Sequence, residues 1–116
     1  MKPVTLKLNK EYKRAYYRGS YKAGPLLVTY VIKNNRHMIR YGITTGKKIG
    51  NAVNRNRSRR IIRAAFRQLL EDFSFSDFPE GLDFVFVARE KTPESKSTDI
   101  YKTMKYQVSH LLSKQK

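Results

Sequence analysis

Residues 46–70 read GKKIGNAVNRNRSRRIIRAAFRQLL, and their character changes halfway along the stretch. In the second half, apolar residues recur every three to four positions, at Ile61, Ile62, Ala65, Phe66, Leu69 and Leu70. This spacing predicts an amphipathic helix from about residue 50 to residue 70, with an apolar stripe that docks on a sheet. The first turns of the same helix are nearly all polar and basic, so core packing does not account for them.

The neighbouring segments predict that sheet. Residues 26–32 and 38–45 have the composition of β-strands, and the Asn34-Asn35 turn signal between them indicates an antiparallel hairpin. Residues 83–88 form a third clear strand. Alternation places apolar side chains on both faces of the first strand, so we expect both faces to be at least partly covered, with one open face as the alternative.

Two more helices complete the predicted fold. The first spans residues 9–18, with Asn9 as its cap and Gly19 at its end. The last begins near residue 97 or 98, with Asp99 in its first turn, and its buried stripe is Ile100, Met104, Val108, Leu111 and Leu112. A chain of 116 residues has room for one domain. We therefore expect a single α+β sandwich over residues 1–116, with helices packed on a small sheet.

The charge of the chain is concentrated in one half. The formal net charge is +16, and 15 of the 25 Lys and Arg residues lie between Tyr12 and Leu70, where there is no Asp or Glu. Such self-repulsion destabilises a compact protein unless a polyanion lies opposite it. Nucleic acid is the partner that this distribution favours.

Several other chemistries find no support in the sequence. The absence of Cys excludes disulfides, thiolate metal sites and Cys nucleophiles. His37 and His110 lie far apart, and the acidic residues lack the spacing of a metal site, so we expect no cofactor or metal bound by the protein itself. Residues 46–50 do not match the phosphate loop of nucleotide hydrolases, because three residues rather than four separate the two glycines.

The sequence also lacks the features of a membrane protein. The N-terminus has no continuous apolar stretch like that of a secretory signal, and no segment approaches the ~20 apolar residues of a spanning helix. The polar turns of the basic helix lack the Trp- or Phe-rich opposite face that is expected at a membrane surface. We expect a cytoplasmic protein with no membrane partner.

The basic run of the predicted helix is the strongest candidate site. Helical spacing aligns Arg55, Arg59 and Arg63 in one row. A solvated helix face normally interleaves acidic and basic residues, and this run has no acid, so we favour RNA contact over an ordinary solvated face. The asparagines can donate to phosphate or 2′-hydroxyl groups. The candidate residues are Lys47, Lys48, Asn54, Arg55, Asn56, Arg57, Arg59, Arg60 and Arg63.

An aromatic group of residues is the second candidate site. Tyr12 and Tyr16 lie four residues apart on one helix face, near Arg14, and Tyr30 lies on the first strand. Stacking of an unpaired base on such a ring contributes roughly 1–3 kcal/mol and tolerates any sequence. Core packing is the competing interpretation for each tyrosine.

Residues 46–63 resemble the signature helix of the bacterial ribonuclease P protein subunit. They depart from it mainly at Arg59, where lysine is usual and the charge is the same. The resemblance extends through residues 9–12, 29–30, 40–43 and 84–89. It implies an α-β-β-β-α-β-α sandwich of the ribosomal protein S5 domain 2 type, in which a left-handed β-α-β crossover carries the basic helix. The fourth strand is then expected in residues 20–23 or 4–8.

The resemblance also implies a function. In that family the RNA subunit uses Mg²⁺ to remove the 5′ leader of precursor tRNA, so the protein would have no catalytic residue of its own and no protein partner. The candidate residues between 47 and 63 would bind the catalytic RNA, and Tyr12, Tyr16, Tyr30 and Arg14 would bind the leader. The family often has Phe where this chain has Tyr on the first helix, and stacking is preserved.

Two rival functions remain open. A general RNA-binding protein would bind precursor and mature tRNA equally. A protein-only nuclease would cleave RNA without an RNA subunit, and the absence of acidic residues from Tyr12 to Leu70 argues against it.

Overall fold

One mixed sheet runs through the computed structural model, which describes residues 3–114. Within these residues its strands lie in the order β1-β4-β5-β3-β2. Their bounds are β1 Val4–Thr5, β2 Ser20–Ala23, β3 Leu27–Lys33, β4 Ile39–Thr44 and β5 Leu82–Ala88. The three clear strands of the sequence are confirmed, but the predicted hairpin is wrong. Residues 26–32 and 38–45 do not pair with each other, because β5 lies between β3 and β4 and pairs with both. Both positions considered for a fourth strand form strands, because residues 20–23 pair with β3 and residues 4–5 pair with β4.

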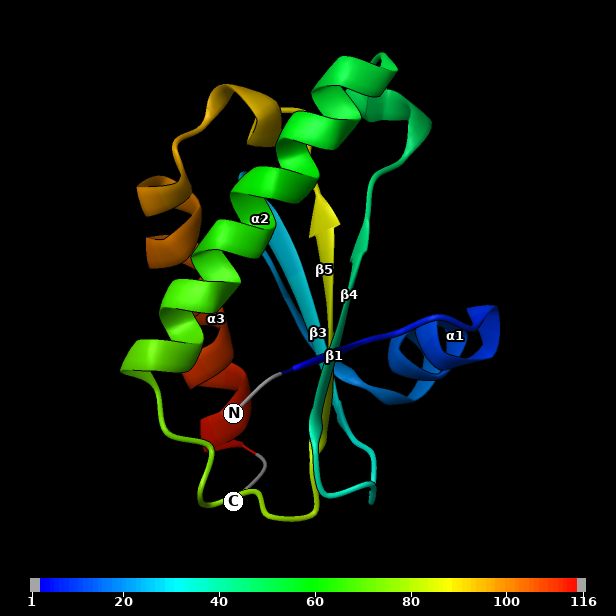
Figure 1. Cartoon of the computed structure of the whole chain (residues 1–116), viewed down its shortest axis with the longest axis vertical. Coiled ribbons are helices and arrows are strands. Elements are labelled where there is room, and N and C mark those ends of the chain that lie inside the picture. Colours follow the sequence, from blue (N-terminus) through cyan, green and yellow to red (C-terminus); the bar gives the residue numbers. More distant parts are fainter. Residues whose placement is uncertain (1–2, 115–116) are drawn as a thin grey trace.

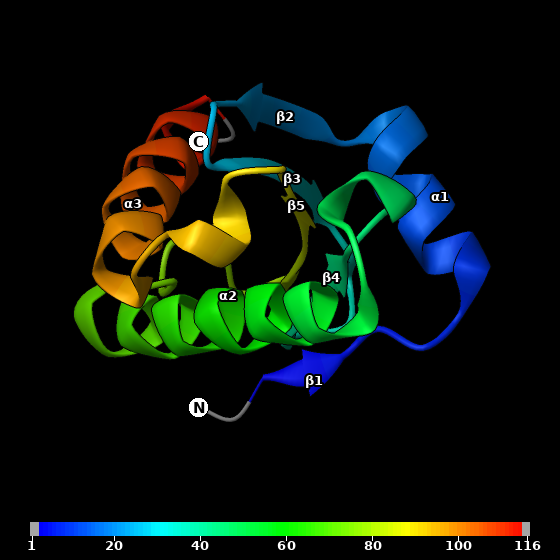
Figure 2. The ribbon, with the colours of Figure 1, turned by 90° about the horizontal axis from the view of Figure 1, so that it is seen from above.

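Three helices cover the two faces of this sheet in the described part of the chain. They are α1 (Asn9–Arg18), α2 (Ala52–Asp72) and α3 (Ser97–Ser113), and single 3₁₀ turns occupy Lys47–Ile49 and Thr92–Glu94. Figures 1 and 2 show α2 and α3 on one face and α1 on the other. The basic first turns of α2 lie at the end of the molecule where β4 and β5 terminate. The predicted α+β sandwich is confirmed.

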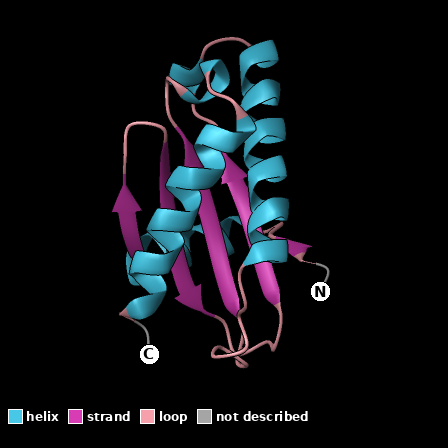
Figure 3. Ribbon diagram, turned by 90° about the vertical axis from the view of Figure 1, so that its left-hand side faces the viewer, coloured by secondary structure: helices cyan, strands magenta, loops and turns pink. Residues whose placement is uncertain are grey.

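The connection from β4 to β5 is a crossover between parallel neighbours. In Figure 3 the N-terminus marks the side on which β1 and β4 lie, and α2 lies between the viewer and the sheet. The chain rises along β4, descends through α2 and rises again along β5, to the left of β4, so the crossover is left-handed. Nearly all such connections are right-handed. The left-handed crossover that the family resemblance implies is therefore present.

The main core lies between the sheet and the α2–α3 layer. Alternate residues of β3 and β5 point into it, so that Leu27, Val31, Phe84 and Phe86 are fully buried. The apolar stripes of the two helices supply the opposing side chains, which include Ile62, Phe66, Leu69, Ile100, Met104 and Val108. The helical spacing in the sequence predicted this packing.

A second, smaller core holds α1 against the other face. Leu6, Ala15 and Val85 are buried there. The helix approaches β4 so closely that a Cβ on Gly42 would lie 2.5 Å from the Tyr12 ring. Gly42 therefore makes room for the first aromatic residue of α1.

The start of α1 differs from the prediction. Asn9 is the first helical residue rather than the cap, and Leu8 occupies the cap position. Glu11 does the capping, because its Oε1 accepts hydrogen bonds from the backbone N–H groups of Lys7 (3.1 Å) and Leu8 (2.9 Å). The prediction failed because Glu11 occupies the third helical position, from which its carboxylate reaches back to the N–H of the cap residue, and this places the cap at Leu8 rather than Asn9. Gly19 ends the helix as expected.

Arg40 joins α1 to the sheet through buried ion pairs. Its guanidinium contacts both carboxylate oxygens of Asp83, at 2.8 and 2.7 Å, and Glu11 Oε2 at 2.5 Å. The Asp83 side chain is 1% exposed and that of Arg40 is 10% exposed. Asn34 donates a further hydrogen bond of 2.8 Å to Asp83. Buried charges of this kind are tolerated only when they are paired and hydrogen-bonded.

Replacing Arg40 by Met should destabilise the protein by about 3–5 kcal/mol, because Asp83 would keep its charge in a buried site without its principal partner. Urea denaturation followed by circular dichroism measures the change. The matched control is Arg36→Met at an exposed arginine in the β3–β4 turn, where we expect a change within about 0.5 kcal/mol. Equal effects of the two substitutions would show that the buried network contributes nothing specific.

Candidate nucleic-acid interface

A cleft lies where α1, the end of β4 and the start of α2 meet. Its volume is about 410 Å³. The lining residues are Asn9, Tyr12, Lys13, Tyr16, Ile43, Thr44, Thr45 and Arg59. Two aromatic rings, two cations and no carboxylate therefore converge from segments far apart in the sequence. A cleft of this composition suits a chain of bases and phosphates.

Tyr12, Tyr16 and Tyr30 come together as the sequence predicted, on the α1 face of the sheet. The rings of Tyr16 and Tyr30 meet edge to face with centroids 4.9 Å apart. The Tyr16 hydroxyl lies 2.8 Å from Thr44 Oγ1, and the Tyr12 hydroxyl donates to the Leu6 carbonyl at 3.5 Å. All three tyrosines are half-buried. Core packing is therefore confirmed for each ring. Each ring also keeps an accessible part, and its stacking with a base stays a prediction.

Tyr21 is an aromatic residue of this face that the sequence analysis did not identify. It pairs with Tyr30 across β2 and β3, and the two rings stack with centroids 5.4 Å apart. Its side chain is 62% exposed. The possible strand at residues 20–23 could have indicated Tyr21, because pairing with β3 in this register brings the two tyrosines opposite each other.

The environment keeps Tyr12 uncharged. Burial raises the pKa of its hydroxyl, and Tyr16 and Glu11 act in the same direction, whereas Arg59 opposes them. The hydroxyl is therefore protonated at neutral pH and remains a hydrogen-bond donor. The opposing effect of Arg59 also shows that this α2 cation lies close to the aromatic residues of α1.

Arg14 has a different environment from the other predicted leader residues. Its guanidinium donates to the Lys33 carbonyl at 2.8 Å and lies 3.9 Å from Asp83. It does not line the cleft, whereas its neighbour Lys13 does. The position of each residue in the helix explains why Lys13 lines the cleft and Arg14 does not. Lys13 is one residue from Tyr12 and three from Tyr16, whereas Arg14 is turned toward the buried carboxylate of Asp83. The sequence analysis assigned the cation beside the tyrosines to Arg14.

The basic first turns of α2 lie at the surface, and hydrogen bonds hold the start of the helix. Asn51 caps the helix by accepting a hydrogen bond of 3.0 Å from the Asn54 backbone N–H. Arg55 donates to the Gly50 carbonyl at 2.6 Å, and Arg59 donates to Asn56 Oδ1 at 3.1 Å.

The remaining predicted cations, Arg57, Arg60 and Arg63, are exposed. None of the α2 arginines forms an ion pair with a carboxylate among residues 3–114. Their charge is thus available to an external anion.

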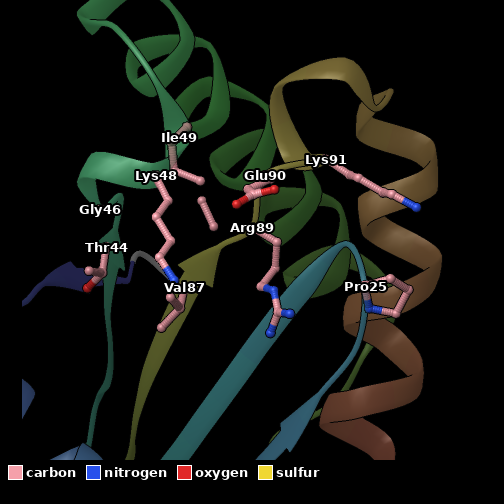
Figure 4. A pocket seen from close by; sticks show the side chains of 10 residues that line it. Pro25, Thr44, Gly46, Lys48, Ile49, Val87, Arg89, Glu90 and Lys91 are labelled. Carbon is pink, nitrogen blue, oxygen red and sulfur yellow. The ribbon is translucent and has the colours of Figure 1, made fainter.

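A second cavity adjoins the cleft and contains Lys48. It measures about 840 Å³ and is lined by Pro25, Thr44, Gly46, Lys48, Ile49, Val87, Ala88, Arg89, Glu90 and Lys91. Thr44 lines both spaces, which makes them neighbours. In Figure 4 the side chains of Lys48 and Arg89 extend toward the same region beside Val87. The side chain of Lys47 lies outside the part of the chain that the structure describes.

Arg89 was not among the predicted site residues. Its position in the sequence could have indicated it, because a basic residue directly after a buried strand lies at the exposed end of that strand. Together with Lys48 it extends the positive lining from the cleft across the ends of β4 and β5.

Glu90 lines the second cavity together with the cations Lys48, Arg89 and Lys91, whereas the carboxylates of the α1 face are paired internally. Glu11 and Asp83 both bind Arg40. The backbone N–H of Leu8, followed by that of Lys7 and by Arg40, holds the pKa of Glu11 below its usual value, so it stays ionised and paired. Across residues 3–114, no three His, Asp or Glu side chains gather into a possible metal site, and no described helix is long and apolar enough to cross a membrane.

Comparison with known proteins gives one consistent family. The family model described as Ribonuclease P matches residues 1–112. The ribonuclease P protein component of Clostridium botulinum (strain Loch Maree / Type A3) is 36% identical over 100 residues, with 86% of each chain covered. That of Pelotomaculum thermopropionicum is 42% identical over 95 residues, covering 82% of this chain and 80% of the relative.

The fold agrees with solved structures. The RNase P protein of Staphylococcus aureus superposes with a TM-score of 0.73 at 28% identity, covering 99% of this chain and 97% of the other. The RNase P protein from Thermotoga maritima has the same fold, with a TM-score of 0.72 at 23% identity over 92% of this chain and 94% of the other. The chain belongs to the ribonuclease P protein family, whose members are components of an endoribonuclease complex in tRNA processing.

Proposed function

We propose that this protein binds the catalytic RNA of ribonuclease P through the basic turns of α2 and holds the 5′ leader of precursor tRNA in the α1–β4 cleft. One observation carries the proposal. The cleft joins the tyrosines of α1 to Arg59 of α2, so a single bound strand meets stacking surfaces and phosphate partners together. The edge of the same cleft is the start of the helix that presents unpaired arginines.

In this proposal the leader lies along the two neighbouring cavities. Bases stack on the accessible parts of Tyr12, Tyr16 and Tyr30, while Lys13 and Arg59 neutralise the adjacent phosphates. Because Thr44 lines both spaces, the strand continues from the cleft to Lys48 and Arg89. None of these contacts requires a particular base, so the proposed site accepts leaders of different sequence.

The remaining arginines of α2 serve the RNA subunit in this proposal. Arg57, Arg60 and Arg63 project from the helix without carboxylate partners, and guanidinium groups bind phosphate oxygens through two parallel hydrogen bonds. Neutralising phosphates on both RNAs lowers the repulsion between them. Asn54 and Asn56 flank Arg55 and suit contacts with 2′-hydroxyl groups.

The chemistry itself is assigned to the RNA subunit and its Mg²⁺ ions. The protein contributes a difference in affinity, because precursor tRNA fills the cleft and mature tRNA does not. Binding energy gained from the leader favours the substrate over the product. No protein side chain takes part in bond cleavage in this scheme.

The deciding experiment measures cleavage of a 5′-extended precursor tRNA at low Mg²⁺ by a bacterial ribonuclease P RNA, with and without this protein, and by the protein alone. We expect stimulation only when the RNA is present. A protein that binds both tRNAs equally and gives no stimulation is a general RNA-binding protein. Cleavage by the protein alone would make it a nuclease in its own right.

Replacing Tyr16 by Ala should weaken binding of leader-bearing tRNA to the holoenzyme by about 1–3 kcal/mol and leave mature tRNA binding unchanged, because one stacking surface is lost. Tyr16→Phe keeps the ring and loses only the contact with Thr44, so its effect should be smaller. Fluorescence titration with both tRNAs measures the difference. Tyr17→Ala, at a neighbouring side chain that is 83% exposed and outside the cleft, is the matched control. Equal losses for both tRNAs would refute leader binding at Tyr16.

Replacing Arg60 by Gln should weaken binding to the RNA subunit and reduce the slope of log affinity against log salt by about 0.7–0.9, the value for one lost phosphate contact. Affinity is measured across a salt series with the complete RNA. Arg36→Gln, at an exposed arginine in the β3–β4 turn, removes the same charge away from α2 and should leave the slope unchanged. If both variants change the slope alike, net charge rather than the α2 surface determines binding.

A further inference from the structure

The outer side of α3 carries a groove far from the proposed leader cleft. It measures about 630 Å³ and is lined by Tyr101, Lys102, Lys105, Tyr106, Ser109 and His110. We call these six residues the α3 groove. Figure 2 shows α3 and α1 on opposite sides of the sheet. A strand bound in the α3 groove is therefore a different segment from one bound beside Tyr12 and Tyr16.

Cations lie over the aromatic rings of this groove. Lys22 Nζ, from β2, lies 5.9 Å from the centre of the Tyr106 ring, and Lys105 Nζ lies 6.0 Å from that of Tyr101. The His110 ring stacks on Tyr106 with centroids 6.2 Å apart and an angle of 21° between planes. Tyr106 is nevertheless 62% exposed. The groove thus holds an aromatic surface in place without burying it in the core.

The groove is positively charged along its length. No carboxylate lines it. Asp72 lies at its edge, where its carboxylate accepts hydrogen bonds from the Tyr101 hydroxyl (2.7 Å) and from Gln68 (2.9 Å). Its pKa is lowered by these bonds and by Lys105, so its negative charge offsets part of the charge of that lysine. Desolvation, Lys22 and Lys114 lower the pKa of His110, and Lys22 lies over the Tyr106 ring on which His110 stacks. An anion bound there would relieve the repulsion.

We propose that the α3 groove is a second binding site for single-stranded RNA, with a base stacked on Tyr106 and phosphates beside Lys22, Lys102 and Lys105. Charge complementarity favours a polyanion. The alternation of tyrosines with lysines favours an unpaired strand over a duplex, since a duplex offers no free base faces. An anionic membrane is a poorer fit, because the groove has no Leu, Phe or Trp to enter the lipid.

The test uses the full-length protein and a short single-stranded RNA of mixed sequence. In a Tyr16→Ala background, which weakens the cleft, Tyr106→Ala should lower the remaining affinity roughly tenfold, and the double replacement Lys102→Gln with Lys105→Gln should flatten the salt dependence. Lys96→Gln, an exposed lysine before the same helix and outside the groove, should change neither. Thermal unfolding confirms that each variant is folded.

A second measurement places the RNA. In NMR titrations of the His110 ring, the same RNA should raise the pKa of His110, because phosphate favours the imidazolium form, and Tyr106→Ala should abolish the rise. An unchanged His110 pKa together with unchanged affinity of the Tyr106→Ala variant would overturn the proposal. So would binding of duplex RNA with equal affinity, or binding of vesicles with anionic headgroups but not of single-stranded RNA.

Discussion

The ion pairs of Arg40 with Asp83 and Glu11 determine where α1 lies, and the proposed leader cleft depends on that position. Asp83 is in the central strand β5, Arg40 is in β4, and Glu11 is in the first turn of the helix, so one guanidinium ties three elements together. Glu11 also caps the helix with the same carboxylate. Because Tyr12 follows Glu11 directly and lies over Gly42, fixing Glu11 fixes the first ring of the cleft. Buried ion pairs often add little net stability, and here we infer that the network sets geometry.

This network also explains how a protein of charge +16 keeps the α1–β4 cleft free of carboxylates. Two carboxylates of the α1 face are used internally, and Glu80 pairs with Lys33 at 3.2 Å in the turn region. The arginines of α2 receive no such partners among residues 3–114. The folded protein therefore holds like charges close together without neutralising them. The proposed association with RNA would relieve this repulsion, so RNA binding would also increase folding stability.

Local sequence patterns predicted most of the elements but few of the contacts between them. Apolar periodicity located the three helices and the central strands, because burial of one face is a local requirement of each element. The short strands β1 and β2 carry little pattern of their own and are defined by pairing with β4 and β3.

The prediction of the site was limited in the same way. Lys13 lines the cleft in place of Arg14, and Tyr21 and Arg89 join the surface, because sheet register and the position of Asp83 decide which side chains meet. The basic run of α2 could be predicted residue by residue, because its exposure follows from the local helical pattern and needs no long-range partner.

The two halves of α2 follow from one constraint. A helix that crosses the sheet between β4 and β5 can be no longer than its apolar stripe unless its extra turns find other stabilisation. Here the turns before Ser58 are stabilised by the Asn51 cap and by bonds from Arg55 and Arg59 to the helix itself. They need no core, so they can extend beyond it and carry cations that pair with no carboxylate among residues 3–114. The crossover brings Arg59 of this helix to Thr44 at the end of β4 and to the tyrosines of α1. A single helix thereby anchors the core and completes the lining of the cleft, so the proposed nucleic-acid surface depends on the placement of α2.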